Sequence, residues 1–133
     1  MIEKKNLRCK CRYKDCERLD KEGNGDKLLI ALSKFQKLLG DKHVIYATNG
    51  YRCAKHNKDV GGVKSSQHTL GKAADIKCRS LAVECLFGAA RDSELFTGIG
   101  IYNTFIHVDI RDKDGRWDKR ETRRKELLPI KLR

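Results

Sequence analysis

Two short motifs carry residues that could jointly hold one divalent metal ion. The first, at residues 66–75, contains His68 and Asp75, and the second, at residues 105–109, contains His107. Zinc accepts histidine nitrogen and carboxylate oxygen as ligands, and a catalytic zinc site typically uses three protein ligands and keeps a further position for water. The residue types therefore predict a metal site made of His68, Asp75 and His107.

Asp109 follows His107 by two residues in a stretch that alternates polar and apolar side chains. Such alternation predicts a strand with His107, Asp109 and Arg111 on one face and the intervening apolar residues facing the core. A carboxylate near the cation could act as the general base that accepts a proton from water. Asp109 could also serve only to orient His107, or the two could be an ordinary surface pair without a metal.

The six cysteines suggest a second metal site. Cys9, Cys11 and Cys16 cluster near the N-terminus, and Cys53 follows later in the chain. Because a closed set of four thiolates suits structural zinc, these four could hold a second zinc ion. The spacing is not that of a standard zinc finger, and free thiols or one or two disulfides formed after release are the alternatives.

The hydrophobic pattern predicts two helices that would support these sites. Apolar residues recur at helical spacing over residues 26–39, with Asn24 or Asp26 as the N-cap and Gly40 at the end. A second helix is expected over residues 80–90, capped by Ser80. A loop rich in glycine and small polar residues is expected over residues 55–66.

Strands are predicted at residues 43–48, 73–77, 98–102 and 105–111, the last two joined as a hairpin. The strand at 73–77 would direct Asp75 inward. The charged residues 112–133 are expected to form a solvated tail or a peripheral helix, in which Trp117 caps the core or stacks on a sugar or base. The predicted fold class is α+β, with helices packed on a small antiparallel sheet.

Length and composition predict a single domain over residues 1–133, with a cysteine-rich segment at about residues 1–20 and a basic segment at about residues 112–133. The net charge of +12 points to an anionic partner or environment, such as cell-wall polymers, anionic membranes or nucleic acid. The sequence shows neither the apolar core of a signal peptide nor a run of about 20 apolar residues. We therefore expect a soluble monomer that is made in the cytoplasm and does not insert into a membrane.

The residues around the predicted metal site resemble a known family. The pattern Ser66-x-His68-x-x-Gly71-x-Ala73-x-Asp75 is similar to the signature of the zinc D-alanyl-D-alanine carboxypeptidases and related peptidoglycan peptidases. This group includes L-alanyl-D-glutamate endopeptidases of phages and shares its fold with the Hedgehog signalling domain. The resemblance covers about residues 44–111 and includes three further motifs in the expected order: Asn49-Gly50-Tyr51-Arg52, His56-Asn57-x-x-Val60-Gly61-Gly62, and the hairpin with Gly98-Ile99-Gly100-Ile101-Tyr102 and Phe105-Ile106-His107-Val108-Asp109-x-Arg111.

The resemblance implies a role for each matching residue. His68, Asp75 and His107 match the zinc ligands of the family. Arg52 matches the arginine that holds the substrate or its developing oxyanion, a role that suits a permanently charged guanidinium able to form two hydrogen bonds at once. Ser66 matches a position that borders the substrate pocket.

One position departs from the family pattern. Several members carry the catalytic carboxylate three residues before the last zinc-binding histidine, where this chain has Thr104, which cannot act as a base at neutral pH. Other relatives show His-x-Asp, as here, so the resemblance assigns the base to Asp109, with orientation of His107 as the alternative. His56 lies in the loop that resembles the family and could contact the substrate.

The resemblance thus implies a hydrolase, a zinc metallopeptidase that cleaves an amide bond involving a D-amino acid in the stem peptide of peptidoglycan. It would act as a D-alanyl-D-alanine carboxypeptidase or an L-alanyl-D-glutamate endopeptidase, and a phage or prophage endolysin that reaches the wall after release is one form it could take. A Hedgehog-like zinc-binding module without catalytic activity is the alternative. Nucleic acid is not an expected partner, because no finger, recognition helix or aromatic sheet motif is evident.

Overall fold

A five-stranded sheet forms the centre of the computed structural model, which describes residues 1–20 and 22–121. The strands lie in the order β1-β2-β4-β3-β5, and all neighbouring pairs are antiparallel except β3 and β5. The α+β class is confirmed, and the predicted hairpin is the β3–β4 pair. The strands are β1 (Ile45–Asn49), β2 (Ala73–Cys78), β3 (Gly98–Ile101), β4 (Ile106–Asp109) and β5 (Gly115–Asp118).

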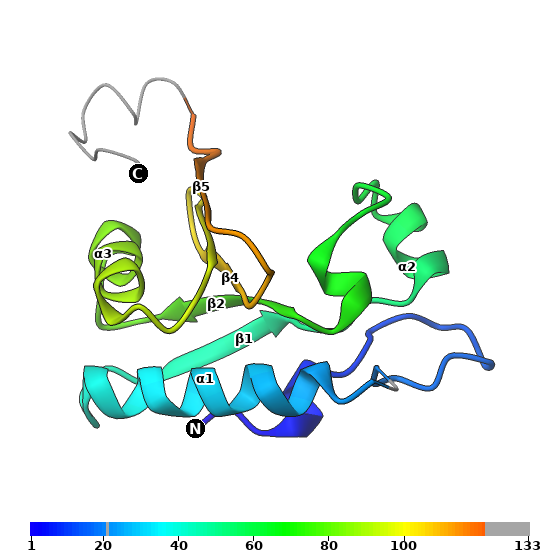
Figure 1. Ribbon diagram of the computed structural model, residues 1–133, viewed down its shortest axis with the longest axis horizontal. Helices are drawn as coiled ribbons and strands as arrows, with labels where there is room; N and C mark the ends of the chain where they lie inside the picture. Colours follow the sequence, from blue (N-terminus) through cyan, green and yellow to red (C-terminus); the bar gives the residue numbers. More distant parts are fainter. Residues whose placement is uncertain (21, 122–133) are drawn as a thin grey trace.

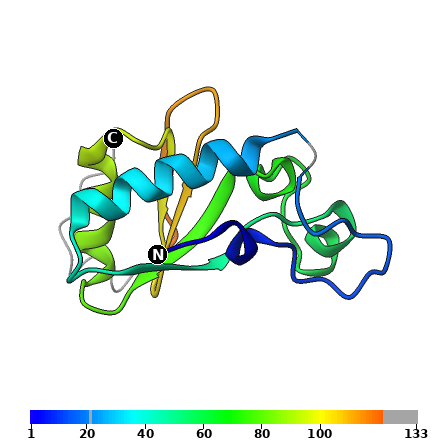
Figure 2. The same ribbon diagram turned by 90° about the horizontal axis from the view of Figure 1, so that it is seen from below.

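Two helices pack against each other and on one face of the sheet, α1 (Asn24–Leu39) and α3 (Val83–Ser93). The short helix α2 (Ala54–Asp59) lies at the opposite end of the molecule from α3 (Figures 1 and 2). Two 3-10 turns complete the fold, η1 (Lys4–Leu7) and η2 (Gln67–Leu70). No helix in the described ranges combines the length and the apolar character needed to cross a membrane.

The hydrophobic core lies between this face of the sheet and the two long helices. Burial of apolar side chains is the main force that holds these layers together. Phe35 of α1 packs edge-to-face on Phe96, with ring centroids 5.6 Å apart. The largest fully buried apolar residues come from α1, α3 and alternate strand positions: Leu28, Leu32, Phe35, Ile45, Ile76, Leu86, Phe87, Ile99, Ile101, Ile106 and Val108.

The other face of the sheet carries the polar residues singled out in the sequence, because successive strand side chains point to opposite faces. Asp75 on β2 lies directly opposite His107 on β4, and Asp109 follows two residues later on the same face. The apolar residues between them face the core, as predicted. The antiparallel ladder between β2 and β4 therefore fixes the spacing of two predicted metal ligands.

Two glycines on β3 make room on this polar face. Gly98 pairs with Asp109, and Gly100 pairs with His107 on one side and Trp117 of β5 on the other. A Cβ atom on Gly98 would clash with the Asp109 carboxylate, and one on Gly100 would clash with the Trp117 indole. Strand β3 thus contributes large side chains only to the core.

Two elements differ from the sequence prediction. Residues 55–66 were predicted as a loop, but α2 forms at their start, with the Cys53 sulfur accepting a hydrogen bond from the His56 N–H at the N-cap. A six-residue helix is too short to show periodicity. The segment from residue 112 was predicted as a tail or peripheral helix, but β5 pairs with β3 there; residues 122–133 lie outside the described part of the chain.

Both predicted N-caps are also wrong. The N-cap of α1 is Gly23, and the Asp20 carboxylate accepts hydrogen bonds from the N–H groups of Asn24 (2.9 Å) and Gly25 (3.0 Å). The carboxylate of a residue before the helix thus accepts hydrogen bonds from N–H groups that an N-cap side chain would otherwise bind. Helix α3 begins at Val83, and Ser80 instead hydrogen-bonds the His43 imidazole at 2.8 Å.

Candidate active site

The three predicted metal ligands converge on one side of a hollow of about 760 Å³. Nε2 of His68 and Nδ1 of His107 each lie 3.3 Å from Oδ1 of Asp75. The two imidazole rings are nearly perpendicular, at 83°, with centroids 5.0 Å apart. All three residues are buried, and their ligand atoms lie within 4.8 Å of one another.

His68 reaches the hollow from the η2 turn, next to the sheet. The Ser66 hydroxyl caps this turn by accepting a hydrogen bond from the His68 N–H at 3.2 Å. The His68 carbonyl in turn accepts a hydrogen bond from the Arg52 N–H at 3.0 Å. The motifs around Ser66 and Arg52 therefore hold each other in place through their main chains.

Both imidazoles are bound at the nitrogen that faces away from the cluster. Nδ1 of His68 lies 2.8 Å from the Gly50 carbonyl, and Nε2 of His107 lies 2.7 Å from Oδ2 of Asp109. Because a carbonyl or an ionised carboxylate can only accept, each outer nitrogen carries a proton. The inner nitrogen of a neutral ring is then left with a free lone pair directed at Asp75, which is the tautomer that a metal ligand requires.

Asp75 is oriented in the same way. Its Oδ2 accepts a hydrogen bond from the Asn49 side-chain amide at 3.2 Å, which leaves Oδ1 to face the two imidazoles. Burial opposes ionisation, but the imidazoles of His107 and His68, when protonated on the side of Asp75, outweigh it and hold the pKa of Asp75 well below its usual range. Three buried acceptors that converge in this way need a cation between them.

Zinc fits this donor set of two imidazole nitrogens and one carboxylate oxygen. The same surroundings also favour a proton. Burial would lower the pKa of His107, but its contacts with Asp109 and Asp75 raise it above the usual value. Protons and a metal ion therefore compete for this cluster.

Asp109 lies under His107 and does not line the hollow. It is fully buried, and Oδ1 accepts hydrogen bonds from the Arg111 backbone N–H (3.1 Å) and Nε (2.9 Å), while Oδ2 accepts from Arg111 Nη2 (2.6 Å) and His107. Burial raises the pKa of Asp109, but His107 and Arg111 lower it further, to well below the usual range. Of the two sequence alternatives, this geometry supports orientation of His107 over a base that takes a proton from the hollow.

Arg52 and Ser66 both line the hollow, as predicted for substrate-contacting residues. Nη2 of Arg52 donates a hydrogen bond to the Ser66 hydroxyl at 3.2 Å. Nε of Arg52 is buried and has no hydrogen-bond partner within the described residues. A guanidinium at the edge of a hollow is suited to binding a carboxylate or a polarised carbonyl oxygen.

Two other positions discussed from the sequence lie elsewhere. His56 is on α2 and lines a different hollow with Cys11 and Asp59, so the structure does not bring it to the metal ligands. Thr104 lies exposed in the turn between β3 and β4. The position where several family members carry a carboxylate therefore faces solvent here.

Three aromatic residues, Tyr102, Phe105 and Trp117, form what we define as the aromatic wall of the hollow. Trp117 was expected to cap the core or to stack on a sugar or base, and no role was predicted for the wall as a whole. Tyr102 and Phe105 stack with centroids 4.5 Å apart, and the Trp117 indole donates a hydrogen bond to the Tyr102 hydroxyl at 3.1 Å. The Arg111 guanidinium lies 5.0 Å from the centre of the Trp117 ring. The signal that could have found Trp117 is the pair of alternating glycines on β3, which leaves space for one large side chain.

The four predicted cysteines also come together, away from this hollow. The sulfur atoms of Cys9, Cys11, Cys16 and Cys53 lie within 4.8 Å of one another. None of the four lines the hollow that holds His68, Asp75 and His107. The structure therefore presents two separate candidate metal-binding groups.

Comparison with known proteins agrees with the chemistry of the hollow. The model of the family described as Peptidase M15 matches residues 2–109. The matched region contains His68, Asp75, His107, Arg52 and Asp109. A search of curated proteins gave no significant match.

Proposed function

Because the chain belongs to the Peptidase M15 family of zinc metallopeptidases, which act on peptidoglycan, we propose that it hydrolyses an amide bond involving a D-amino acid in the peptidoglycan stem peptide. The observation that carries the proposal is the convergence of His68 Nε2, Asp75 Oδ1 and His107 Nδ1 in a hollow that Arg52 also lines. This arrangement combines a place for a metal ion with a place for a substrate oxygen.

His68, Asp75 and His107 would hold a zinc ion, which supplies a Lewis acid that polarises the scissile carbonyl and lowers the pKa of water from about 16 to about 7. The chain's own contribution is to fix the two histidine tautomers. The Gly50 carbonyl keeps a proton on Nδ1 of His68, and Asp109 keeps a proton on Nε2 of His107. We assign Asp109 this positioning role.

Arg52 is proposed to bind a substrate carboxylate or the oxygen on which negative charge develops. Ser66 restrains one end of the guanidinium, and the side chain of Arg52 lines the hollow. Lys119 also lines the hollow and adds positive charge, whereas the charge of Arg111 is offset by its ion pair with Asp109. A stem peptide, with its free carboxylates, complements this charge.

One observation favours the alternative of a Hedgehog-like zinc-binding module without catalytic activity. Among the described residues that line the hollow, Asp75 has the only carboxylate, and Thr104 is exposed in a turn. A metal site that lacks a carboxylate to accept a proton could be structural. A zinc-binding assay cannot distinguish the two functions, because both include a bound zinc ion. Catalytic turnover distinguishes them.

The proposed activity is tested by incubating zinc-loaded protein with purified muropeptides and identifying the products by mass spectrometry, with and without a chelator. Release of a terminal D-alanine would identify a carboxypeptidase, and a new D-glutamate amine terminus would identify an endopeptidase. Zinc-loaded protein that yields neither product from muropeptides or intact sacculi would establish the non-catalytic alternative.

Arg52→Ala is the variant that tests the substrate role. Loss of a charge-stabilising donor is expected to lower kcat/KM about 10²- to 10³-fold with zinc content unchanged. Arg52→Lys should lose less, because it keeps the charge but not the paired donors. The exposed Arg79→Ala is the matched control and should retain activity; an Arg52→Ala enzyme as active as this control would remove Arg52 from the mechanism.

An endolysin role is part of the same proposal. The net charge of +12 would concentrate the protein on the anionic cell envelope after release from the cell. Lysis of cells from within on co-expression with a holin, and no lysis by His68→Ala, are the expected results. Turnover on muropeptides without such lysis would limit the function to the peptidase activity.

A further inference from the structure

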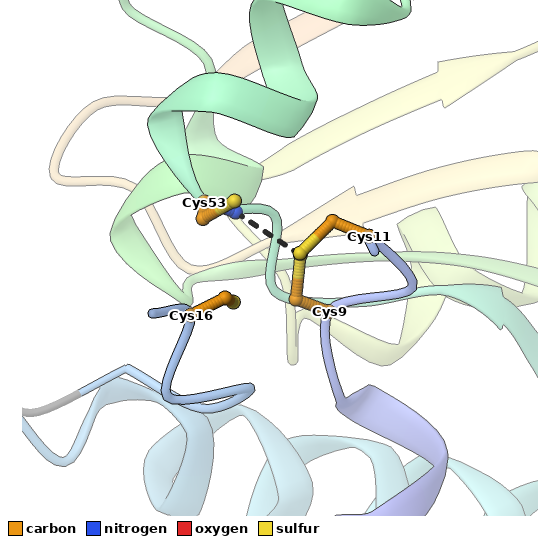
Figure 3. A group of neighbouring side chains, drawn as sticks. All are labelled: Cys9, Cys11, Cys16 and Cys53. Carbon is orange, nitrogen blue, oxygen red and sulfur yellow. Dashed lines mark hydrogen bonds between the residues drawn. The ribbon is translucent and has the colours of Figure 1, made fainter. Parts of the chain in front are cut away.

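A second group of side chains outside the active site has the composition of a metal centre. Cys9 and Cys11 lie after η1, Cys16 lies in the following loop, and Cys53 lies just before α2 (Figure 3). Their sulfur atoms lie within 4.8 Å of one another. We propose that these four cysteines bind a structural zinc ion, distinct from the ion held by the active site.

The separation of the sulfur atoms suits tetrahedral zinc. Zn–S bonds of about 2.3 Å place the four sulfurs of a tetrahedral site roughly 3.8 Å apart. The observed limit of 4.8 Å means that a shift of about 1 Å or less at the widest pair would complete the site. Three of the four residues lie close together in the sequence, between Cys9 and Cys16, and the fold brings Cys53 to them.

Backbone N–H groups point at three of the four sulfurs. The Cys53 N–H lies 3.3 Å from the Cys9 sulfur, and the His56 N–H lies 3.4 Å from the Cys53 sulfur. The Arg18 N–H lies 3.3 Å from the Cys16 sulfur. Donors directed at sulfur stabilise the thiolate form, which is the form that binds metal.

The fourth sulfur is bound by a cation. Nη1 of Arg18 lies 3.0 Å from the Cys11 sulfur and also donates to the Cys11 carbonyl. Four thiolates around one Zn²⁺ carry a net charge of −2, and the Arg18 guanidinium offsets part of it. Each thiol releases its proton to solvent when the ion binds, so no oxidant or reductant is required.

Disulfides account less well for this arrangement. A disulfide requires an S–S distance of about 2.05 Å, and all six cysteines are free in the structure. Two independent disulfides would also give no reason for all four sulfurs to meet at one point. The remaining cysteines lie apart from the cluster, Cys78 on β2 and Cys85 on α3.

The proposed ion would anchor a segment that has no regular secondary structure. Described residues 8–20 and 22–23, between η1 and α1, form neither helix nor strand. The contacts that tie their loop to α2 include the exposed Lys55–Asp15 ion pair (2.8 Å) and the Tyr13–Asp59 hydrogen bond. Exposed pairs of this kind contribute little stability. A zinc ion would replace them as the main link between this segment and Cys53.

The first test measures zinc content after purification under reducing conditions. Wild-type protein should carry two equivalents of zinc, and the double variant His68→Ala/His107→Ala should keep one. X-ray absorption at the zinc edge of this double variant should show four sulfur ligands at about 2.3 Å. This measurement leaves the cysteines intact and needs no peptidase activity, so its failure is distinct from failure of the proposed function.

The second test removes one thiol at a time. Cys16→Ser and Cys53→Ser should each lose one equivalent of zinc and become cleavable by trypsin at the basic residues of segment 8–20, whereas Cys78→Ser and Cys85→Ser should match the wild type. A folded double histidine variant without zinc, or with nitrogen and oxygen ligands only, would overturn the proposal. Oxidised Cys9, Cys11, Cys16 or Cys53 in protein alkylated without reduction would also overturn it.

Discussion

In each of the two active-site histidines, a hydrogen bond at the outer ring nitrogen fixes the tautomer and leaves the inner nitrogen free to bind metal. The two hydrogen-bond acceptors differ in charge. His68 has a neutral carbonyl of Gly50, whereas His107 has the ionised carboxylate of Asp109. A carboxylate makes the imidazole a stronger electron donor than a carbonyl does. Asp109 is therefore expected to contribute to zinc affinity through His107, without contact with substrate.

Asp109→Asn tests this positioning role. The side-chain amide keeps the size of the carboxylate but loses its charge, so zinc affinity should fall about 10- to 100-fold. Competition with a chromophoric chelator measures the zinc Kd, and kcat is measured at saturating zinc. The exposed Asp112→Asn is the matched control. An unchanged zinc Kd with abolished turnover would instead identify Asp109 as the general base.

Among the elements, strand β3 alternates glycine with isoleucine. Its alternate residues fill the core with isoleucine and leave glycine on the polar face, where Asp109 and Trp117 occupy the space. One face of the strand thus contributes to the hydrophobic core, and the other face leaves room for side chains of the neighbouring strands. Substitution of its glycines should report on each of these neighbours separately.

Gly98→Ala should displace the Asp109 carboxylate, because the new Cβ would overlap it. Overpacking of this kind costs about 1–3 kcal/mol, and urea unfolding should show a loss of this size together with weaker zinc binding. Gly88→Ala is a control of opposite sign. Its Cβ would meet nothing closer than 3.8 Å, and alanine stabilises a helix interior by about 0.5–1 kcal/mol. Equal effects of the two substitutions would contradict this account of β3.

Gly100→Ala should move Trp117 instead. The new Cβ would overlap the indole, break its hydrogen bond to the Tyr102 hydroxyl and expose the ring to water. Trp117 is the only tryptophan in the chain, so its fluorescence emission reports this change directly. A red shift relative to the wild type is expected, and an unchanged spectrum would show that β5 yields without moving the ring.

The elements with strong local signals were predicted correctly. Residues 43–48 and the 98–111 hairpin are rich in β-branched and aromatic residues, and both form strands near the predicted bounds, as do residues 73–77. The end of α1 at Gly40 was also predicted. The grouping of His68, Asp75 and His107 was expected from residue type and from family resemblance. The β2–β4 pairing brings Asp75 and His107 together, and the η2 turn supplies His68.

The remaining features depend on contacts distant in sequence. The sequence of strand β5 lies in a segment rich in charged residues and resembles a solvated tail. It forms a strand because it pairs with β3. The Asp20 cap of α1 is supplied from outside the helix, where no local pattern marks it. The burial of Asp109 under His107 also could not be read from alternation, which places both residues on one face without saying which of them faces the hollow.

For the molecule as a whole, the main consequence of composition is its charge. A net charge of +12 on 133 residues gives a long-range attraction to anionic polymers that salt can screen. The hollow adds local positive charge from Arg52 and Lys119. Surface attraction and substrate binding should therefore respond differently to ionic strength.

Binding to sacculi should fall steeply as salt rises from about 50 mM to about 500 mM, because the Debye length shortens to a few ångströms. A sedimentation assay measures retention, and sacculi stripped of anionic wall polymers are the matched control. Cleavage of small soluble muropeptides should change much less over the same range. Retention that is independent of salt would show that charge does not bring the protein to the wall.

The cross-strand pairing of Asp75 with His107 has a consequence for how the protein is assembled. If β2 or β4 slipped by a single residue, these side chains would turn toward the helices, and Ala74, Ile76 or Val108 would turn toward solvent. A shift of register would therefore disrupt the hydrophobic core and the zinc-binding face together. A chain that has reached its stable register already has these two ligands in place, so selection against misfolding is at the same time selection for a competent enzyme.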